Sequence, residues 1–159
     1  MPKPSVYLET TVISLLTARP TRDIVQSALQ QLTREWWEQR RHDFELLSSV
    51  FVVEEAMKGD AAAAKRRMEV LNQLHELPYT PETEALATRL LRETRLPAKA
   101  HLDALHLASA AVHEVDYLVT WNCTHIANAV IIPDVRSVCS LAGYDCPHIC
   151  TPQELMNLL

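Results

Sequence analysis

Glycine is scarce in this sequence: among 159 residues there are only two, Gly59 and Gly143. Phosphate-binding loops of the P-loop and dinucleotide-binding types need glycines, because only a residue without a side chain lets the backbone approach a phosphate closely. No stretch of the sequence is glycine-rich. The sequence therefore argues against nucleotide-binding sites of these two kinds.

Long apolar runs are also lacking, and no segment approaches the length needed to cross a membrane. The first residues, Met-Pro-Lys-Pro, do not show the basic and then apolar layout of a signal peptide. We therefore expect a cytoplasmic protein with no membrane association. In that compartment the four cysteines are expected to be free thiols that pack as small apolar side chains.

Composition and charge set further limits. Apolar residues make up 48% of the sequence, which is ample for one core, so we expect residues 1–159 to form a single domain. The formal net charge of −5 argues against a protein that coats nucleic acid non-specifically. An enzyme that grips a short stretch of nucleic acid remains compatible with this charge.

Short β-prone segments alternate with helical segments along the chain. No regular element is predicted between residues 9 and 21, and the capping box Thr151-Pro152-Gln153-Glu154 predicts the start of a last helix. Alternating strands and helices predict a parallel sheet covered by helices on both faces. The predicted strands are 6–8, 44–49, 75–80, 116–121 and 148–150, and the predicted helices are about 21–41, 50–57, 61–74, 81–95, 97–114 and 134–142, with a short turn or helix at 125–128.

Polar candidates for a site fall where predicted strands end and helices begin. Glu9 follows the first strand, and Asn122 follows the fourth strand just after Thr120. The carboxyl ends of parallel strands share one edge, where ligands bind in open α/β sheets. Asp103 lies early in an apolar helix, where the helix dipole favours an ionised carboxylate. A simple helix-start charge is the alternative explanation for Asp103.

Two adjacent acids, Glu54 and Glu55, interrupt the apolar stretch from residue 50 to residue 56. Acidic side chains are costly to bury unless they are paired or bound to a metal. At least one of the two is expected at the solvated end of the helix.

The same segments resemble the PIN-domain nucleases, especially the VapC toxins of VapBC toxin–antitoxin pairs. The resemblance implies a three-layer α/β/α sandwich with a mainly parallel central sheet. It places metal-binding carboxylates on Glu9, Glu54 and Asp103, and for this reason Glu54 is preferred over Glu55. Asn122 falls on a fourth, usually acidic, position. The resembling segments span nearly the whole chain: 6–14, 48–54, 103–108 and 118–122.

The resemblance also implies supporting roles and shows two departures. Thr11 and Thr120 match small polar positions that help to fix ligands or a metal-bound water. Glu9 replaces the usual aspartate, which moves its oxygens by about 1.5 Å. Asn122 replaces an acid, so we expect one firmly held ion. His125 is a further supporting candidate, although a structural hydrogen bond is its commoner role.

The implied function is a metal-dependent endoribonuclease that hydrolyses RNA with Mg²⁺ or Mn²⁺ as cofactor, and the implied role is that of a toxin. A cognate antitoxin that binds across the site and a homodimer are the implied protein partners. The alternative is a catalytically weak or inactive PIN-like module that binds metal or RNA.

Two further interpretations remain open. Arg92, Arg95 and Lys99 are possible RNA-contacting residues, although acidic neighbours such as Glu82 and Glu93 also fit an ordinary solvated face. His106 and His113 could instead join Asp103 in a nitrogen-rich zinc site, for which the sequence offers no further ligand pair.

Overall fold

A five-stranded parallel sheet forms the centre of the structure, a computed structural model that describes residues 2–157. The strands lie in the order β3-β2-β1-β4-β5, and all four pairings are parallel, which confirms the predicted sheet. The strands are β1 (Ser5–Leu8), β2 (Glu45–Ser49), β3 (His75–Leu77), β4 (Tyr117–Val119) and β5 (His148–Cys150).

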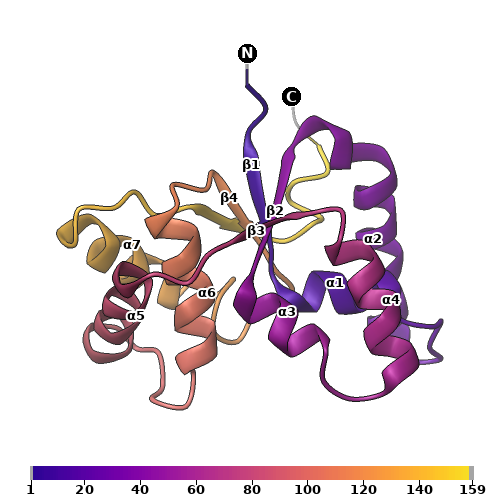
Figure 1. Cartoon of the computed structure of the whole chain (residues 1–159), viewed down its shortest axis with the longest axis horizontal. Helices are drawn as coiled ribbons and strands as arrows, with labels where there is room; N and C mark the ends of the chain where they lie inside the picture. Colours follow the sequence, from indigo (N-terminus) through magenta and orange to yellow (C-terminus); the bar gives the residue numbers. More distant parts are fainter. Residues whose placement is uncertain (1, 158–159) are drawn as a thin grey trace.

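Helices cover both faces of the sheet, which gives the expected three-layer α/β/α arrangement (Figure 1). One layer contains α1 (Thr10–Thr17), α2 (Ile24–Arg40) and α4 (Ala61–Leu71). The other contains α5 (Pro81–Glu93), α6 (His101–Val112) and α7 (Ile131–Leu141). The short α3 (Val50–Ala56) begins where β2 ends and contacts helices of both layers, and a 3-10 turn (Arg41–Asp43) follows α2. No helix within residues 2–157 is long and apolar enough to span a membrane.

The strand order creates a switch point beside β1. From β1 the chain builds β2 and β3 on one side and later returns to place β4 and β5 on the other side. In open α/β sheets the connections leave a crevice at such a reversal, outside the carboxyl ends of the two strands. Glu9 directly follows β1, and Thr120 directly follows β4. The fold therefore brings these two residues to the same crevice.

The core explains why the chain adopts this arrangement. Val6, Tyr7 and Leu8 are fully buried, as expected for a central parallel strand with helices on both faces. Trp36 of α2 is also fully buried and stacks on Phe44 with 5.8 Å between ring centroids. The amphipathic helices and these strands form one continuous apolar core.

Two end regions differ from the sequence-based expectations. Helix α1 was not predicted, because the β-branched run from Thr10 to Ile13 has low helix propensity. It is capped by Glu9, whose side chain accepts a hydrogen bond from the backbone N–H of Thr11. At the other end, Thr151 and Glu154 form their capping-box hydrogen bonds, but residues 152–156 are turns. Residue 157 has no regular structure, and the last two residues of that predicted helix, 158–159, lie outside the described residues.

The adjacent tryptophans of α2 offer a test of the core. Trp36→Ala should lower the free energy of unfolding by about 3 kcal/mol or more, because it empties a fully buried site. Trp37 is only half-buried, with the Arg41 guanidinium 5.3 Å from its ring centroid, so Trp37→Ala should cost much less. Chemical denaturation of the two variants measures the difference, and equal losses would contradict this description of the core.

Candidate active site

The carboxylate of Glu9 lies at the switch point and is only 3% exposed. Its Oε1 atom accepts hydrogen bonds from the hydroxyls of Thr11 and Thr120, each at 2.5 Å. Its Oε2 atom accepts the backbone N–H of Thr11 at 3.2 Å, and the backbone N–H of Glu9 donates to the carbonyl of Val119 at 3.1 Å. These contacts hold Glu9 between the ends of β1 and β4.

A second carboxylate, that of Glu55, reaches the same edge from α3. Its Oε1 atom lies 2.6 Å from both the Thr10 hydroxyl and Nε2 of His106. Burial opposes ionisation of Glu55, but the hydrogen bond and charge of His106 and the hydroxyl of Thr10 outweigh it and lower the Glu55 pKa. Glu55 is therefore an ionised, firmly oriented carboxylate.

A chain of buried groups supports His106 from behind. Its Nδ1 atom lies 2.6 Å from the hydroxyl of Tyr7, and that hydroxyl lies 2.6 Å from Oγ of Ser49. Burial raises the pKa of the Tyr7 hydroxyl well above its usual value, and the charges of Glu9 and Glu55 add to this effect against the opposing hydrogen bond from Ser49. His106 is 1% exposed, so its ring is held by Tyr7 on one side and faces Glu55 on the other.

Glu9, Glu55 and His106 together form a possible metal-binding group. Each offers one ligand atom, and the three atoms lie within 4.8 Å of one another. Ligands on opposite sides of a magnesium-sized ion are about 4 Å apart, so this spread suits a shared ion. Carboxylate oxygens suit Mg²⁺ and Mn²⁺, and an imidazole nitrogen suits divalent transition ions better than it suits Mg²⁺.

Asp103 anchors a neighbouring cluster on α6. Its Oδ1 atom accepts the side-chain amide of Asn122 at 3.1 Å, and its Oδ2 atom lies 2.9 Å from Nδ1 of His125. The backbone N–H of Asn122 donates to the Thr120 hydroxyl at 2.9 Å, and that hydroxyl donates to Glu9. A continuous chain of hydrogen bonds therefore links Asp103 to Glu9.

The structure brings most of the residues predicted for the site to one edge, with one exchange. Glu9, Thr11 and Thr120 lie in the first group, and Asp103, Asn122 and His125 form the second. Glu54, the expected second carboxylate, is exposed and lies outside this group, whereas its neighbour Glu55 lies in it.

The phase of α3 explains this exchange. Its buried residues are Phe51, Val52 and Ala56. At about 100° per residue, Glu55 falls within the arc that these residues define, whereas Glu54 lies on the opposite side. The sequence alone gave no signal that could select Glu55, because Val50 and Val53 place apolar side chains on the other side of the helix as well. Tyr7 and Ser49, which appeared only as strand residues, carried no such signal.

Histidines of α6 do not gather around Asp103 as a zinc site would require. Nε2 of His106 faces Glu55, and Asp103 is paired with Asn122 and His125. His113 is ten residues further along the helix, about 15 Å away, where it lines a different pocket with His75. The group of three ligand atoms contains neither Asp103 nor His113.

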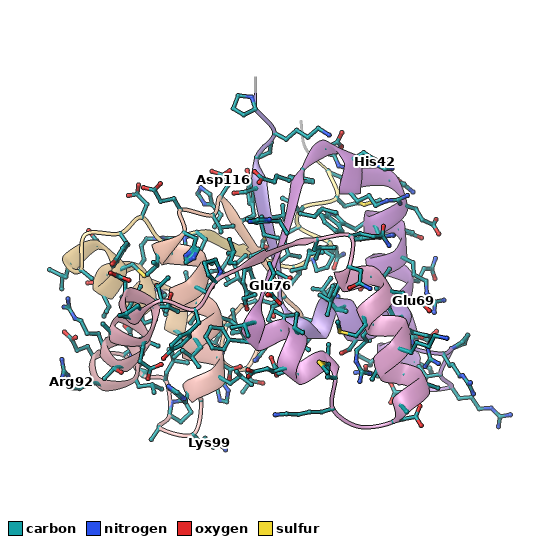
Figure 2. All side chains as sticks on the ribbon, in the orientation of Figure 1. His42, Glu69, Glu76, Arg92, Lys99 and Asp116 are labelled. Atoms are coloured by element: carbon teal, nitrogen blue, oxygen red, sulfur yellow. The ribbon has the colours of Figure 1, made fainter. Side chains whose placement is uncertain are left out.

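The basic residues that were predicted to contact RNA lie in α5 and in the loop between α5 and α6. Figure 2 shows Arg92 on the outer side of α5 and Lys99 in the loop before α6. Arg92 lies 3.8 Å from a Glu93 oxygen, and Arg95 lies 3.4 Å from an oxygen of Asp134. These exposed ion pairs fit the solvated-face interpretation, and contact with RNA stays a prediction.

A pocket of about 560 Å³ opens beside the group, between α1 and the start of α2. Glu9 and Glu55 are among its lining residues, together with Thr10 and Trp121. The indole N–H of Trp121 donates to the Thr33 hydroxyl at 2.7 Å, which fixes this wall of the pocket to α2. Arg19, which is exposed, lies on the pocket lining and supplies a positive charge.

Comparison with solved structures shows that the chain has a known fold. A toxin–antitoxin complex from Klebsiella pneumoniae matches with a TM-score of 0.56 and 20% identity, over 76% of this chain and 88% of that one. VapC20 of Mycobacterium tuberculosis, a Sarcin-Ricin loop cleaving toxin, matches with a TM-score of 0.56 and 14% identity, over 88% and 96% of the chains. The chain has the PIN-domain fold of VapC toxins.

A third structure, VapBC2 from Rickettsia felis bound to a DNA fragment from its promoter, matches with a TM-score of 0.54 and 14% identity. It covers 74% of this chain and 87% of that one. No protein-family model matches the sequence, and no curated protein matches it. The resemblance to VapC structures is therefore one of fold, reached at low sequence identity.

The hydroxyl that joins the two clusters can be tested directly. Thr120→Val should lower the free energy of unfolding by about 1–3 kcal/mol, because it removes a donor to buried Glu9 and leaves the Asn122 N–H without its acceptor. Thr17→Val is a matched control, since Thr17 donates only to α1 carbonyls near a helix end. Urea unfolding measures both variants, and a Thr120→Val protein as stable as the Thr17→Val protein would argue against a shared buried site.

Proposed function

We propose that this protein is a metal-dependent endoribonuclease and acts as the toxin of a toxin–antitoxin pair. The observation that carries the proposal is the convergence of Glu9, Glu55 and His106 at the switch point of the sheet, with Asp103 linked to them by hydrogen bonds. The fold shared with VapC structures supports the same proposal, and VapC20 is a toxin that cleaves the Sarcin-Ricin loop.

The residues present fit a divalent cation. Two acids, Glu9 and Glu55, offer oxygens within 4.8 Å of a histidine nitrogen, and Asp103 lies one helical turn before His106 on the same side of α6. Glu9 and Glu55 would hold Mg²⁺ or Mn²⁺, which usually keep several waters and need few protein ligands, and Asp103 would add negative charge beside them. When bound, such an ion lowers the pKa of a coordinated water and neutralises charge on a phosphate.

The surrounding side chains fix the carboxylates and leave room for substrate. Thr11 and Thr120 hold one oxygen of Glu9, and Asn122 holds one oxygen of Asp103. The 560 Å³ pocket continues from the carboxylates along α1, where an RNA strand would lie, with Arg19 beside its backbone phosphates. Hydrolysis adds water across one P–O bond and leaves a phosphate on one new end and a hydroxyl on the other.

An antitoxin is the proposed protein partner, because two of the matching structures are toxin–antitoxin assemblies. Ile24 and Val25 at the start of α2 are 85% and 66% exposed, and they adjoin Gln26, which lines the pocket. Apolar side chains so exposed are candidates for burial by a partner. A homodimer stays a prediction from the family resemblance.

The competing function is a module that binds metal or RNA without cutting. It is favoured by Asn122, which supplies an amide where the family usually has an acid, and by Asp103, both of whose oxygens already have partners. Activity measurements separate the two functions.

Cleavage of total RNA tests the proposal. The wild-type protein should cut RNA with Mg²⁺ or Mn²⁺, should stop when a chelator is added, and should resume when the metal is restored. Asp103→Asn should reduce the cleavage rate by about 100-fold or more, because it removes a charge at the reacting centre. If wild type and Asp103→Asn cut equally, or if chelator has no effect, metal-dependent hydrolysis at this site is wrong.

The adjacent acids of α3 provide a matched pair of variants. Glu55→Gln should reduce RNA cleavage by about 100-fold, because the amide retains the shape but not the charge of the carboxylate. Glu54→Gln makes the same chemical change on the exposed side of the helix and should leave the rate within about twofold of wild type. The opposite pattern of rates would restore Glu54 as the site residue.

A further inference from the structure

His106 is the unusual member of the group at the switch point. It is buried, its Nε2 atom lies 2.6 Å from Oε1 of Glu55, and a ring nitrogen lies within 4.8 Å of a carboxylate oxygen of Glu9. The two acids alone would offer only oxygen ligands. A nitrogen within 4.8 Å of both acidic ligand atoms changes which divalent ion suits the site.

The support behind His106 is the kind that a metal-ligating histidine needs. Such a residue almost always donates its other ring N–H to an oxygen, which fixes the ring and its tautomer. Nδ1 of His106 lies 2.6 Å from the buried Tyr7 hydroxyl, and this hydroxyl lies 2.6 Å from Ser49 Oγ, with either group able to donate. The Tyr7 hydroxyl oxygen can therefore accept a hydrogen bond from the Nδ1–H group of His106 while it donates its own proton to Ser49. In this tautomer Nε2 carries no proton, and its lone pair is free to bind a metal.

The network of His106, Tyr7 and Ser49 has two states, one with an ion bound and one without. In the state without an ion, Nε2 of His106 hydrogen-bonds to Oε1 of Glu55 at 2.6 Å. An ion bound by both atoms would replace this hydrogen bond with two ligand bonds, and the two atoms would move apart, because adjacent ligands at about 2.1 Å from one ion lie about 3 Å from each other. Reversal of the Tyr7 and Ser49 hydroxyls would supply the matching tautomer. Tyr7 can hold the buried His106 ring in both states, so the movement would fall on the more exposed Glu55 side chain.

We infer that His106 ligates the metal through Nε2, together with Glu9 and Glu55, and so makes the site prefer Mn²⁺ over Mg²⁺. Imidazole binds Mn²⁺ and the later transition ions well, whereas Mg²⁺ strongly favours oxygen ligands. This inference rests on the proposed metal site and adds its ligand set and ion preference. Asp103, already paired with Asn122 and His125, lies outside the group of three.

Calorimetry and pulsed electron paramagnetic resonance on the whole protein test the inference. We expect Mn²⁺ to bind at least about tenfold more tightly than Mg²⁺, and the bound Mn²⁺ to show coupling to a ¹⁴N nucleus. Labelling the histidines with ¹⁵N in the wild-type protein should change that coupling to the ¹⁵N pattern. This measurement needs no variant, so it stands even if a substitution at buried His106 prevents folding.

Two histidine variants assign the signal. His106→Gln should abolish the nitrogen coupling and reduce Mn²⁺ affinity about tenfold, while Mg²⁺ affinity changes by less than about threefold. His125→Gln should keep the coupling, because His125 faces Asp103. Coupling that disappears in His125→Gln but survives in His106→Gln would overturn the assignment, as would equal binding of the two ions by wild type.

The outcomes also separate this inference from the proposed function. Mn²⁺ bound without nitrogen coupling, in a protein that cuts RNA, would refute the His106 ligand and leave the ribonuclease proposal standing. Nitrogen coupling in a protein that cuts no RNA would support the ligand set and refute the ribonuclease.

Discussion

The buried carboxylate of Glu9 is the group on which the site depends. An acid that is 3% exposed must be compensated, and here three hydrogen bonds compensate it. Two come from Thr11 at the start of α1, and one comes from Thr120 at the end of β4. Glu9 therefore joins the first strand and helix to a strand more than a hundred residues later, and its position fixes the crevice between them.

A second set of contacts, from side chains of β1 and β2, supports His106. Tyr7 belongs to β1 and Ser49 ends β2, and together they hold His106 of α6 against Glu55 of α3. The site is thus built from both helical layers and braced through the sheet that separates them. Such bracing holds functional groups in position more precisely than a loop could. It also gives a buried polar network in which each member has a partner, as a core of this kind requires.

Alternating strand and helix signals were enough to predict the parallel sheet, because a helix separates each short strand from the next along the chain. The sequence pattern was also enough to place Glu9, Asp103 and Asn122 at one edge. The choice between Glu54 and Glu55 depended on the rotation of a seven-residue helix, which the family resemblance did not resolve and the buried positions of α3 do. Helix α1 escaped prediction because local propensity opposes it, and tertiary contacts with α2 and α4 stabilise it instead.

The network of Tyr7, Ser49 and His106 could not have been predicted, because its members are far apart in the sequence and meet only through the strand order. Tyr7 and His106 are 99 residues apart, and Tyr7 and Ser49 are 42 apart. All three lie in segments that resemble the PIN-domain nucleases, but the resemblance assigned a role to none of them. Their meeting follows from the pairing of β1 with β2 and from the packing of α6 on the sheet.

The most direct test of the central claim is a crystal structure of the protein soaked with Mn²⁺, with the ion located by its anomalous scattering. We expect one strong peak at the switch point, at ligand distance from carboxylate oxygens of both Glu9 and Glu55, about 2.2 Å. A peak that contacts Glu54 instead, or no peak at this edge of the sheet at a saturating concentration of Mn²⁺, would contradict the claim that these residues form a metal site.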